Sequence, residues 1–384
     1  MHAAAESANP ELDLFRDTVR RYAENELAPQ YAAWEEAEHI PREIWNQLGE
    51  SGLLCVDMPE EYGGGGGDFA MSAVIVEELS RQGLTGLATG VTVHSDIVAP
   101  YVLHMGTEDQ KQAWLPRLAS GDAIGAIAMT EPGAGSDLQG MRSQAVADGD
   151  DWTLNGAKTF ITNGGQADLV IVAARTEPGG GARGTSLFLV DTSLDGFRRG
   201  RNLEKIGQHA GDTAELFFDD LRLPGNALLG ARNGGFGHLI DELPRERLAL
   251  AIGAIGAAEG ALAITIDYVN ERKAFGQTIG SFQNTRFSLA EMQTDIQLNR
   301  AFMEKCLAKF EAGTMDVTDA AMVKYAATEM QCRVADGCLQ LFGGYGYMRE
   351  YPIARAFVDA RVQRIYGGTS EIMKELIARS LVGK

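Results

Sequence analysis

Three short segments of this 384-residue chain combine glycines with side chains that can form hydrogen bonds. In residues 128–137, two glycines let backbone N–H groups approach an anion closely, while hydroxyls supply directed donors. In residues 340–347, glycines between helical patterns permit a flat ligand to approach, and Gln340 can offer it an amide. In residues 365–372, two glycines precede a Thr-Ser pair that can cap a helix. The start of such a helix exposes N–H groups to a phosphate or a carbonyl oxygen.

Each of these segments also has an ordinary structural interpretation. Residues 128–137 can form a tight turn between two domains, and composition alone favours that interpretation because short glycine motifs recur by chance. Residues 340–347 can be a helix C-cap followed by a turn. The chemistry therefore depends on the elements that position these segments.

The N-terminal third of the chain has a helical pattern. Leu12, Phe15, Val19 and Tyr22 recur at three- and four-residue steps, so residues from about 11 to 125 predict helices. The five glycines at 63–67 predict a flexible loop between helices. They lack the Lys-Ser/Thr ending of a phosphate loop, which argues against nucleotide binding there.

The next hundred residues have a strand-and-turn pattern. Residues 152–154 and 158–161 predict a hairpin that turns at Asn155 and Gly156. The other predicted strands are residues 169–173, 186–190 and 214–218. Short strands at this spacing favour a small β-barrel or sandwich over a parallel sheet.

Long helical patterns return from about residue 236. Gly253, Gly256 and Gly260 predict a helix with a narrow, close-packing face, and Pro244 is expected at its start or at a kink. Residues 248–266 are nearly uncharged but rich in Ala and Gly, which predicts a core helix and no membrane span. We therefore expect a mainly helical α+β fold with three domains: an N-terminal helical domain (1–125), a middle β-barrel or sandwich domain (126–235) and a C-terminal four-helix bundle (236–384).

The composition excludes several classes of function. With 53 acidic and 34 basic residues, the net charge of −19 argues against nucleic-acid and anionic-membrane partners. His94, His104, His209 and His238 lack the spacing of metal ligands, so we predict no metal.

The cysteines and the N-terminus bear on location. Four scattered cysteines predict reduced, mostly buried thiols, as in a cytosol or an organelle matrix. Residues 1–10 carry neither a secretory signal nor an Arg-rich transit peptide. This favours a bacterial cytoplasm, and a mitochondrial matrix after removal of a leader stays open.

Together the three segments resemble the acyl-CoA dehydrogenase family. Residues 128–137 and 340–347 resemble its two signature regions, and 365–372 its flavin- and thioester-contacting turn. Residues 366–379 look closest to the long-chain branch. The resemblance implies a homotetrameric FAD enzyme that forms a trans double bond between the α and β carbons of a medium-chain, long-chain or branched acyl-CoA. It also implies that electrons pass to an electron-transfer flavoprotein.

This chemistry requires a base, because a carboxylate in a dry pocket must take the α-proton while a hydride leaves the β carbon for flavin N5. Many family members have Glu after the tyrosine of the closing turn, where this chain has Gly367. Residues 243–248 resemble the helix that carries the base in long-chain and isovaleryl enzymes, and the matching carboxylate is Glu246. The alternative is a solvated first-turn Glu stabilised by the helix dipole. We expect Arg247 to orient the site or bind substrate, and Arg245 to be a surface charge.

By the same resemblance, the backbone N–H of residue 367 polarises the thioester carbonyl together with a flavin ribityl hydroxyl. The implied FAD contacts are Ile127, Met129, Thr130, Gly135, Ser136, Phe160, Ile161, Thr162, Arg272, Phe275, Gln283, Gln340, Leu341, Gly343, Gly344, Thr369 and Glu371. Of these, residues 272–276 and Gln283 match positions that reach the flavin of a neighbouring subunit. The implied substrate contacts are Ser136, Pro244, Arg247, Tyr366, Gly367 and Gly368. The small residues Gly86, Ala88, Thr89 and Gly90 either line the acyl channel or serve ordinary helix packing.

Two other functions stay open on the sequence. One is a flavin oxidase or monooxygenase on the same scaffold, in which oxygen reaches the reduced flavin. The other is a non-catalytic acyl-CoA-binding scaffold that has lost its base. Glu246 is the residue that discriminates the scaffold from the enzyme.

Overall fold

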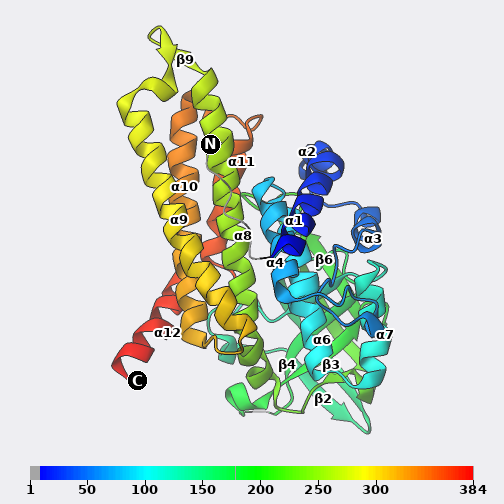
Figure 1. Cartoon of the computed structure of the whole chain (residues 1–384). Coiled ribbons are helices and arrows are strands. Elements are labelled where there is room, and N and C mark those ends of the chain that lie inside the picture. The colour runs from blue at the N-terminus through cyan, green and yellow to red at the C-terminus, as the bar shows by residue number, and fades with distance from the viewer. Residues whose placement is uncertain (1–8, 178, 384) are drawn as a thin grey trace.

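The computed structural model describes residues 9–177 and 179–383 (Figure 1). As predicted, the N-terminal part is helical, and Val19 and its neighbours at helical spacing pack into its core. Its elements are α1 (Pro10–Tyr22), η1 (Ala23–Leu27), α2 (Ala28–Ala37), α3 (Arg42–Glu50), η2 (Glu60–Tyr62), α4 (Phe69–Arg81), α5 (Thr85–Val91), η3 (Thr92–Val98), α6 (Ala99–Met105) and α7 (Glu108–Ala119).

The five-glycine loop at 63–67 joins η2 to α4, but it is packed against the chain. Gly66 N donates to Met58 O at 2.9 Å, and Gly67 N donates to Val56 O at 2.9 Å. A Cβ on Gly64 would overlap the backbone of Met58. The glycines therefore permit close backbone approach, which corrects the prediction of a flexible loop.

The middle part is a largely antiparallel eight-stranded sheet, in the order β6-β7-β3-β2-β4-β5-β8, with β1 parallel to β4. Its strands are β1 (Gly125–Ala128), β2 (Gln144–Asp148), β3 (Asp151–Thr162), β4 (Leu169–Arg175), β5 (Thr185–Asp191), β6 (Phe197–Asn202), β7 (Thr213–Leu223) and β8 (Leu228–Leu229); short 3₁₀ turns are η4 (Leu138–Gly140), η5 (Gly181–Gly184) and η6 (Gly225–Ala227). Alternate residues of β4 enter two cores. Leu169 and Ile171 pack with α6 and α7, and Val170 and Val172 pack with β3, β5 and β7.

The predicted hairpin at Asn155 and Gly156 is wrong. Both residues lie inside β3, where the pairing with β7 shifts register between Leu154 and Gly156. Gly156 has φ +151, and a Cβ there would overlap the side chain of Ser143. The glycine therefore marks a β-bulge that brings two strands close together, and not a chain reversal.

The C-terminal part is a bundle of long helices. It contains α8 (Gly235–Glu271), α9 (Gln283–Glu311), α10 (Val317–Phe342), α11 (Pro352–Ala360) and α12 (Ser370–Val382), with β9 (Lys273–Ala274), β10 (Gln277–Thr278), η7 (Ile279–Ser281), η8 (Gly343–Tyr347) and η9 (Arg361–Arg364) between them. Pro244 lies inside α8 and not at its start. Gly256 and Gly260 face the backbone of α4, as the predicted close-packing face requires.

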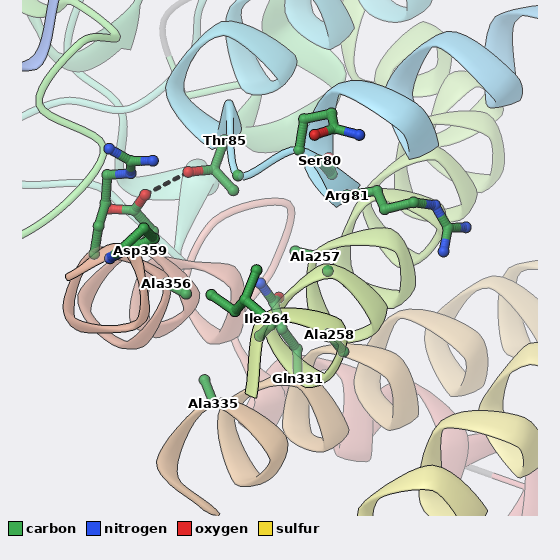
Figure 2. A pocket seen from close by; sticks show the side chains of 16 residues that line it. Ser80, Arg81, Thr85, Ala257, Ala258, Ile264, Gln331, Ala335, Ala356 and Asp359 are labelled. Carbon is green, nitrogen blue, oxygen red and sulfur yellow. Dashed lines mark hydrogen bonds between the residues drawn. The ribbon is translucent and has the colours of Figure 1, made fainter. Parts of the chain in front are cut away.

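A small cavity of about 60 Å³ lies between α4, α8, α10 and α11 (Figure 2). At its edge, Thr85 Oγ1 donates to Asp359 Oδ2, and the backbone N–H of Gln208 donates to Asp359 Oδ1. Burial raises the pKa of Asp359 to about 7. These bonds attach α11 to α5 and to the loop before β7.

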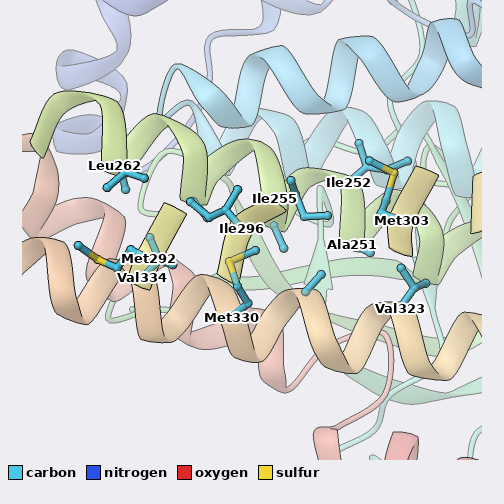
Figure 3. Close-up of a cluster of buried hydrophobic side chains, with 14 of the residues drawn as sticks. Ala251, Ile252, Ile255, Leu262, Met292, Ile296, Met303, Val323, Met330 and Val334 are labelled. Atoms are coloured by element: carbon cyan, nitrogen blue, oxygen red, sulfur yellow. The ribbon is translucent and has the colours of Figure 1, made fainter. Parts of the chain in front are cut away.

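The bundle core is formed by α8, α9 and α10. Figure 3 shows Ile252, Ile255, Ile296 and Met330 from these helices pointing into the same space. Among the described residues, α8 is the one helix long and apolar enough to cross a membrane, but 72% of its most apolar window is buried inside the protein. It is therefore a core helix, as predicted.

Candidate active site

Glu246 lies on α8 at the contact with α6 and is 4% exposed. The hydroxyl of Tyr101 on α6 donates to Glu246 Oε1 at 3.0 Å. Burial raises the pKa of Glu246 to about 7, against the hydrogen bond from Tyr101 and the charge of Arg247, which both lower it. Because α8 begins at Gly235, this glutamate is neither solvated nor in the first turn. The arrangement provides a dry carboxylate that can exchange a proton near neutral pH.

Arg245 precedes Glu246 and is buried, so the prediction of a surface charge is wrong. Its Nη2 contacts Asp57 Oδ2 at 2.6 Å and Asp96 Oδ1 at 3.0 Å. Its guanidinium also lies 4.7 Å from the centre of the Phe69 ring. Burial raises the pKa of Asp96 to about 6. Asp57 lies in a loop and Asp96 in η3. The residues around 245 do not indicate that these acids pack against Arg245.

Two buried cations contact the closing turn before α12. Arg247 Nε donates to Gly367 O at 3.4 Å, and Lys324 Nζ on α10 donates to Gly368 O at 2.7 Å. Burial and the charge of Arg247 together lower the pKa of Lys324 to about 8. Among the described residues, Arg247 Nη1 has no hydrogen-bond partner although it is buried. Arg247 can therefore donate a further bond to a ligand.

The turn itself requires glycine. Gly367 has φ +62 and Gly368 has φ +100, in the region that side chains rarely adopt. A Cβ on Gly367 would overlap Cδ1 of Leu250, which follows Glu246 by one turn on α8. Position 367 thus faces the side of α8 that carries Glu246. Thr369 caps α12 by accepting from the N–H of Ile372 at 3.3 Å, as predicted.

The remaining residues near this turn have different exposures. Glu371 is exposed in the first turn of α12, and Pro244 is half-buried on α8. The hydroxyl of Tyr366 is buried, which raises its pKa, and Thr89 and Gln208 lie beside it.

The first glycine segment follows β1, where Ile127 is half-buried. Lys158 on β3 is fully buried and anchors this segment, because its Nζ donates to Met129 O at 3.0 Å and to Glu131 Oε1 at 2.9 Å. The backbone N–H of Thr159 donates to Thr130 O at 3.0 Å. Beyond this anchor Gly135 and Ser136 are exposed. The loop can therefore present donors to a ligand from a fixed base.

An exposed aromatic ring lies on the adjacent strand. Phe160 is 67% exposed and has φ +60, whereas Ile161 is buried and Thr162 is half-buried. The pairing of β3 with β7 is irregular between Lys158 and Ile161. The irregularity turns the Phe160 ring outward, where a flat ligand can cover it.

The second glycine segment lies far from Glu246. It follows α10 at η8 and borders a cavity of about 570 Å³ that includes Arg272. The predicted FAD residues in its lining are Arg272, Gln340, Leu341, Gly343 and Gly344. Phe275 is exposed on the neighbouring connection between α8 and α9, and Gln283 is exposed at the first residue of α9. Arg272 caps the C-terminal end of α8, 26 residues after Glu246. At the rise per residue of an α-helix, the two positions are about 39 Å apart along the helix axis. Within one chain, the predicted FAD residues therefore fall into two groups that lie far apart.

The small residues of α5 have a packing role at two positions. A Cβ on Gly86 would contact Gly211 N and the Tyr31 hydroxyl, and a Cβ on Gly90 would contact Asn163 Oδ1. Helix packing thus explains these two glycines, which face protein atoms.

Three family models match successive parts of the chain: the acyl-CoA dehydrogenase N-terminal domain at residues 9–122, the middle domain at 126–221 and the C-terminal domain at 233–382. The chain belongs to the acyl-CoA dehydrogenase family. It is 52% identical over 374 residues to the mitochondrial long-chain specific acyl-CoA dehydrogenase of Sus scrofa, covering 97% of this chain and 86% of the relative. The family resemblance seen in the sequence is confirmed, and the chain is an oxidoreductase.

Solved structures of the family have the same fold. An acyl-CoA dehydrogenase from Geobacillus kaustophilus matches with a TM-score of 0.95 and 48% identity, covering 98% of this chain and 99% of that one. A glutaryl-CoA dehydrogenase from Mycobacterium smegmatis in complex with FADH2 matches with a TM-score of 0.92 and 32% identity, covering 98% of this chain and 95% of that one.

Sequence reasoning missed two side chains at this site of the acyl-CoA dehydrogenase fold. Tyr101 lies in an apolar stretch and carries no local motif. Lys324 is the more detectable of the two, because it is a lone charge beside the apolar Val323 on a helix that also buries Ala320 and Ala327. A lone charge beside a buried stripe indicates a buried ionic contact.

Proposed function

We propose that the chain is an FAD-dependent dehydrogenase of acyl-CoA esters that forms the trans-2-enoyl-CoA, with Glu246 as the base. The observation that carries this proposal is the buried carboxylate of Glu246, bonded to Tyr101 and set on the side of α8 that faces position 367. When bound, FAD supplies the hydride acceptor for the β carbon. Glu246 takes the α-proton, so the substrate loses one proton and one hydride.

The described residues fit a flavin and a thioester. The exposed Phe160 ring offers an apolar surface to a flat ring system, and the exposed Ser136 offers a hydroxyl for a polar contact. The backbone N–H of Gly367 can donate to the thioester oxygen, and a glycine keeps this donor because it needs no side chain. Arg247 and Lys324 support that peptide by contacting the turn's two carbonyl oxygens. The unpartnered Nη1 of Arg247 supports its contact with the substrate.

We propose a homotetramer, as the family resemblance implies, and the division of the FAD residues into two groups supports a contact between subunits. The group around Arg272 and the group around Thr130 and Thr369 would belong to FAD molecules shared between neighbouring subunits. Phe275, 95% exposed beside the 570 Å³ cavity, supports a subunit contact at this end of the bundle. We further propose that an electron-transfer flavoprotein accepts the electrons and that the enzyme works in a bacterial cytoplasm.

The proposed substrates are medium-chain, long-chain or branched acyl-CoA esters. The named long-chain specificity of the Sus scrofa relative supports the longer chains. Anaerobic bleaching of the yellow protein by acyl-CoA esters of graded length and branching tests this preference. Rapid peroxide release when the bleached protein meets air would instead favour an oxidase.

The variant Glu246→Gln tests the base. We expect it to fold and to retain FAD, but to lower kcat with dodecanoyl-CoA by roughly three orders of magnitude or more, because the amide cannot accept the α-proton. Glu108→Gln is the matched control, since Glu108 also accepts a hydrogen bond from a tyrosine, Tyr62, at 3.0 Å. Near-normal turnover in Glu246→Gln would remove this residue from the mechanism and leave the scaffold function open.

A further inference from the structure

Tyr101 and Glu246 form a buried contact between α6 and α8. Tyr101 is fully buried, and its hydroxyl donates to Glu246 Oε1 at 3.0 Å. Among the described residues, no hydrogen bond reaches the other oxygen, Oε2. One oxygen of the carboxylate is thus held by protein, and the other carries no hydrogen bond from the described residues.

Neighbouring contacts fix the distance between these two helices. One turn from Tyr101 and Glu246, His104 Nδ1 on α6 contacts Glu242 Oε1 on α8 at 2.6 Å. Arg245 on α8 pairs with Asp96 on η3, which runs directly into α6. Because contacts on both sides hold α6 against α8, the two helices cannot separate at Tyr101 and Glu246 without breaking these contacts.

The charges around Glu246 come from three helices. On α8 these are Arg247, which favours the ionised carboxylate, and Glu242, which opposes it. On α6 they are Tyr101 and His104, and on α10 Lys324 lies next to Arg247. Burial and the Glu246 charge raise the pKa of Tyr101 well above its usual value, so its phenol stays protonated and donates throughout the neutral range.

We propose that Tyr101 is a positioning residue for the base: its phenol fixes the Glu246 carboxylate in one orientation and leaves Oε2 to take the substrate proton. This inference rests on the proposed role of Glu246. The hydrogen bond also stabilises the charged form, because it donates to an oxygen that carries part of the negative charge. Tyr101 thereby determines both where the base points and at what pH it is ionised.

The variant Tyr101→Phe tests the inference, because it removes only the hydroxyl. A base acts in its ionised form, so kcat/KM rises with pH through the pKa of Glu246 in the free enzyme. Loss of the hydrogen bond disfavours the ionised form and raises that pKa. We expect the acid limb of the pH profile of kcat/KM with dodecanoyl-CoA to move to higher pH by about one to two units. On this limb kcat/KM should fall by at least about tenfold.

Tyr62→Phe is the matched control. It removes a tyrosine hydroxyl that also donates to a glutamate, Glu108, at 3.0 Å. We expect its pH profile to match that of the unmutated enzyme. If the acid limb is unshifted in folded Tyr101→Phe while Glu246→Gln is inactive, the inference about Tyr101 is overturned and the proposed function stands. An active Glu246→Gln would instead overturn the proposed function.

A second measurement keeps Tyr101 in place, in case Tyr101→Phe does not fold. Lowering the pH through about 7 protonates Glu246 and weakens the acceptor of the Tyr101 hydrogen bond. We expect the infrared difference spectrum of the holoenzyme to show a shift in a tyrosine C–O band that Glu246→Gln lacks. If the same band shift persists in Glu246→Gln, or no band shifts in the unmutated enzyme, the inference fails.

Discussion

Moving the carboxylate from position 246 to position 367 should succeed only when Leu250 is made smaller. The starting variant is Glu246→Gln, in which the proposed base is absent. Adding Gly367→Glu places a carboxylate on the closing turn, opposite the same side of α8. A Cβ at 367 would overlap Cδ1 of Leu250, however, so the Leu250 side chain must move aside before the new side chain can leave the backbone.

The structure sets the size of this effect. A side chain at φ +62 costs about 1–2 kcal/mol in backbone strain. Forcing a side chain against Leu250 costs about 1–3 kcal/mol more. We expect Gly367→Glu to lower the free energy of unfolding by about 2–5 kcal/mol in total. Leu250→Ala should return the packing part of that loss, because Leu250 Cδ1 is the atom in the way, while the backbone strain should remain.

The assay combines urea unfolding with turnover of dodecanoyl-CoA. We expect Glu246→Gln/Gly367→Glu to stay inactive, and the triple variant that adds Leu250→Ala to regain measurable turnover. Glu246→Gln/Leu250→Ala is the control and should stay inactive. Turnover regained with Leu250 intact would refute the reasoning. So would a folded, FAD-bound triple variant without activity, because position 367 would then not face the substrate's α carbon.

Two further substitutions test the buried ion pairs that support the site. Arg245→Met leaves Asp57 and Asp96 without their cation and should lower the free energy of unfolding by about 3–5 kcal/mol at pH 7.5, measured in urea. Because burial raises the pKa of Asp96 to about 6, the folded state binds its proton more readily than the unfolded chain, so this loss should shrink at pH 5.5. The addition of Asp96→Asn should recover part of it, and an equal loss at both pH values would contradict the argument. Lys158→Met leaves the Glu131 carboxylate buried without its cation, so we expect a loss of about 3 kcal/mol and a lower fraction of FAD retained after gel filtration. Adding Glu131→Gln should restore part of the stability, and unchanged stability in Lys158→Met would show that the pair does not support the loop.

The order of helical, β and helical parts could be predicted from periodicity, because burial on one side of an element repeats every two or about four residues. The error at Asn155 and Gly156 has a different cause. A hairpin turn and a β-bulge both use a glycine with positive φ, so the local residues do not distinguish them. The close approach of Ser143, the residue just before β2, favours the bulge. The glycines at 63–67 are a similar case, because what they pack against lies outside the motif.

Glu246 could be found because its segment resembles the long-chain and isovaleryl enzymes, but its surroundings could not. A glutamate after Pro244 is a common feature of an exposed helix start, and residues near it did not show that α8 begins earlier. The same local sequence does not show that Arg245 is buried. Its acids lie 149 and 188 residues away, so their approach depends on how η3 and the loop after α3 pack on α8.

The sequence by itself determined which side chains each element carries: a carboxylate and two arginines in a row on one helix, and a glycine turn before another. Only the tertiary structure decided which of these charges are dry, which are paired, and that Tyr101 contacts Glu246 and Lys324 contacts the closing turn. The physical reason is one of range. Periodicity and capping act over about four residues, whereas burial, pKa and hydrogen bonding at Glu246 depend on atoms from helices far away in the chain.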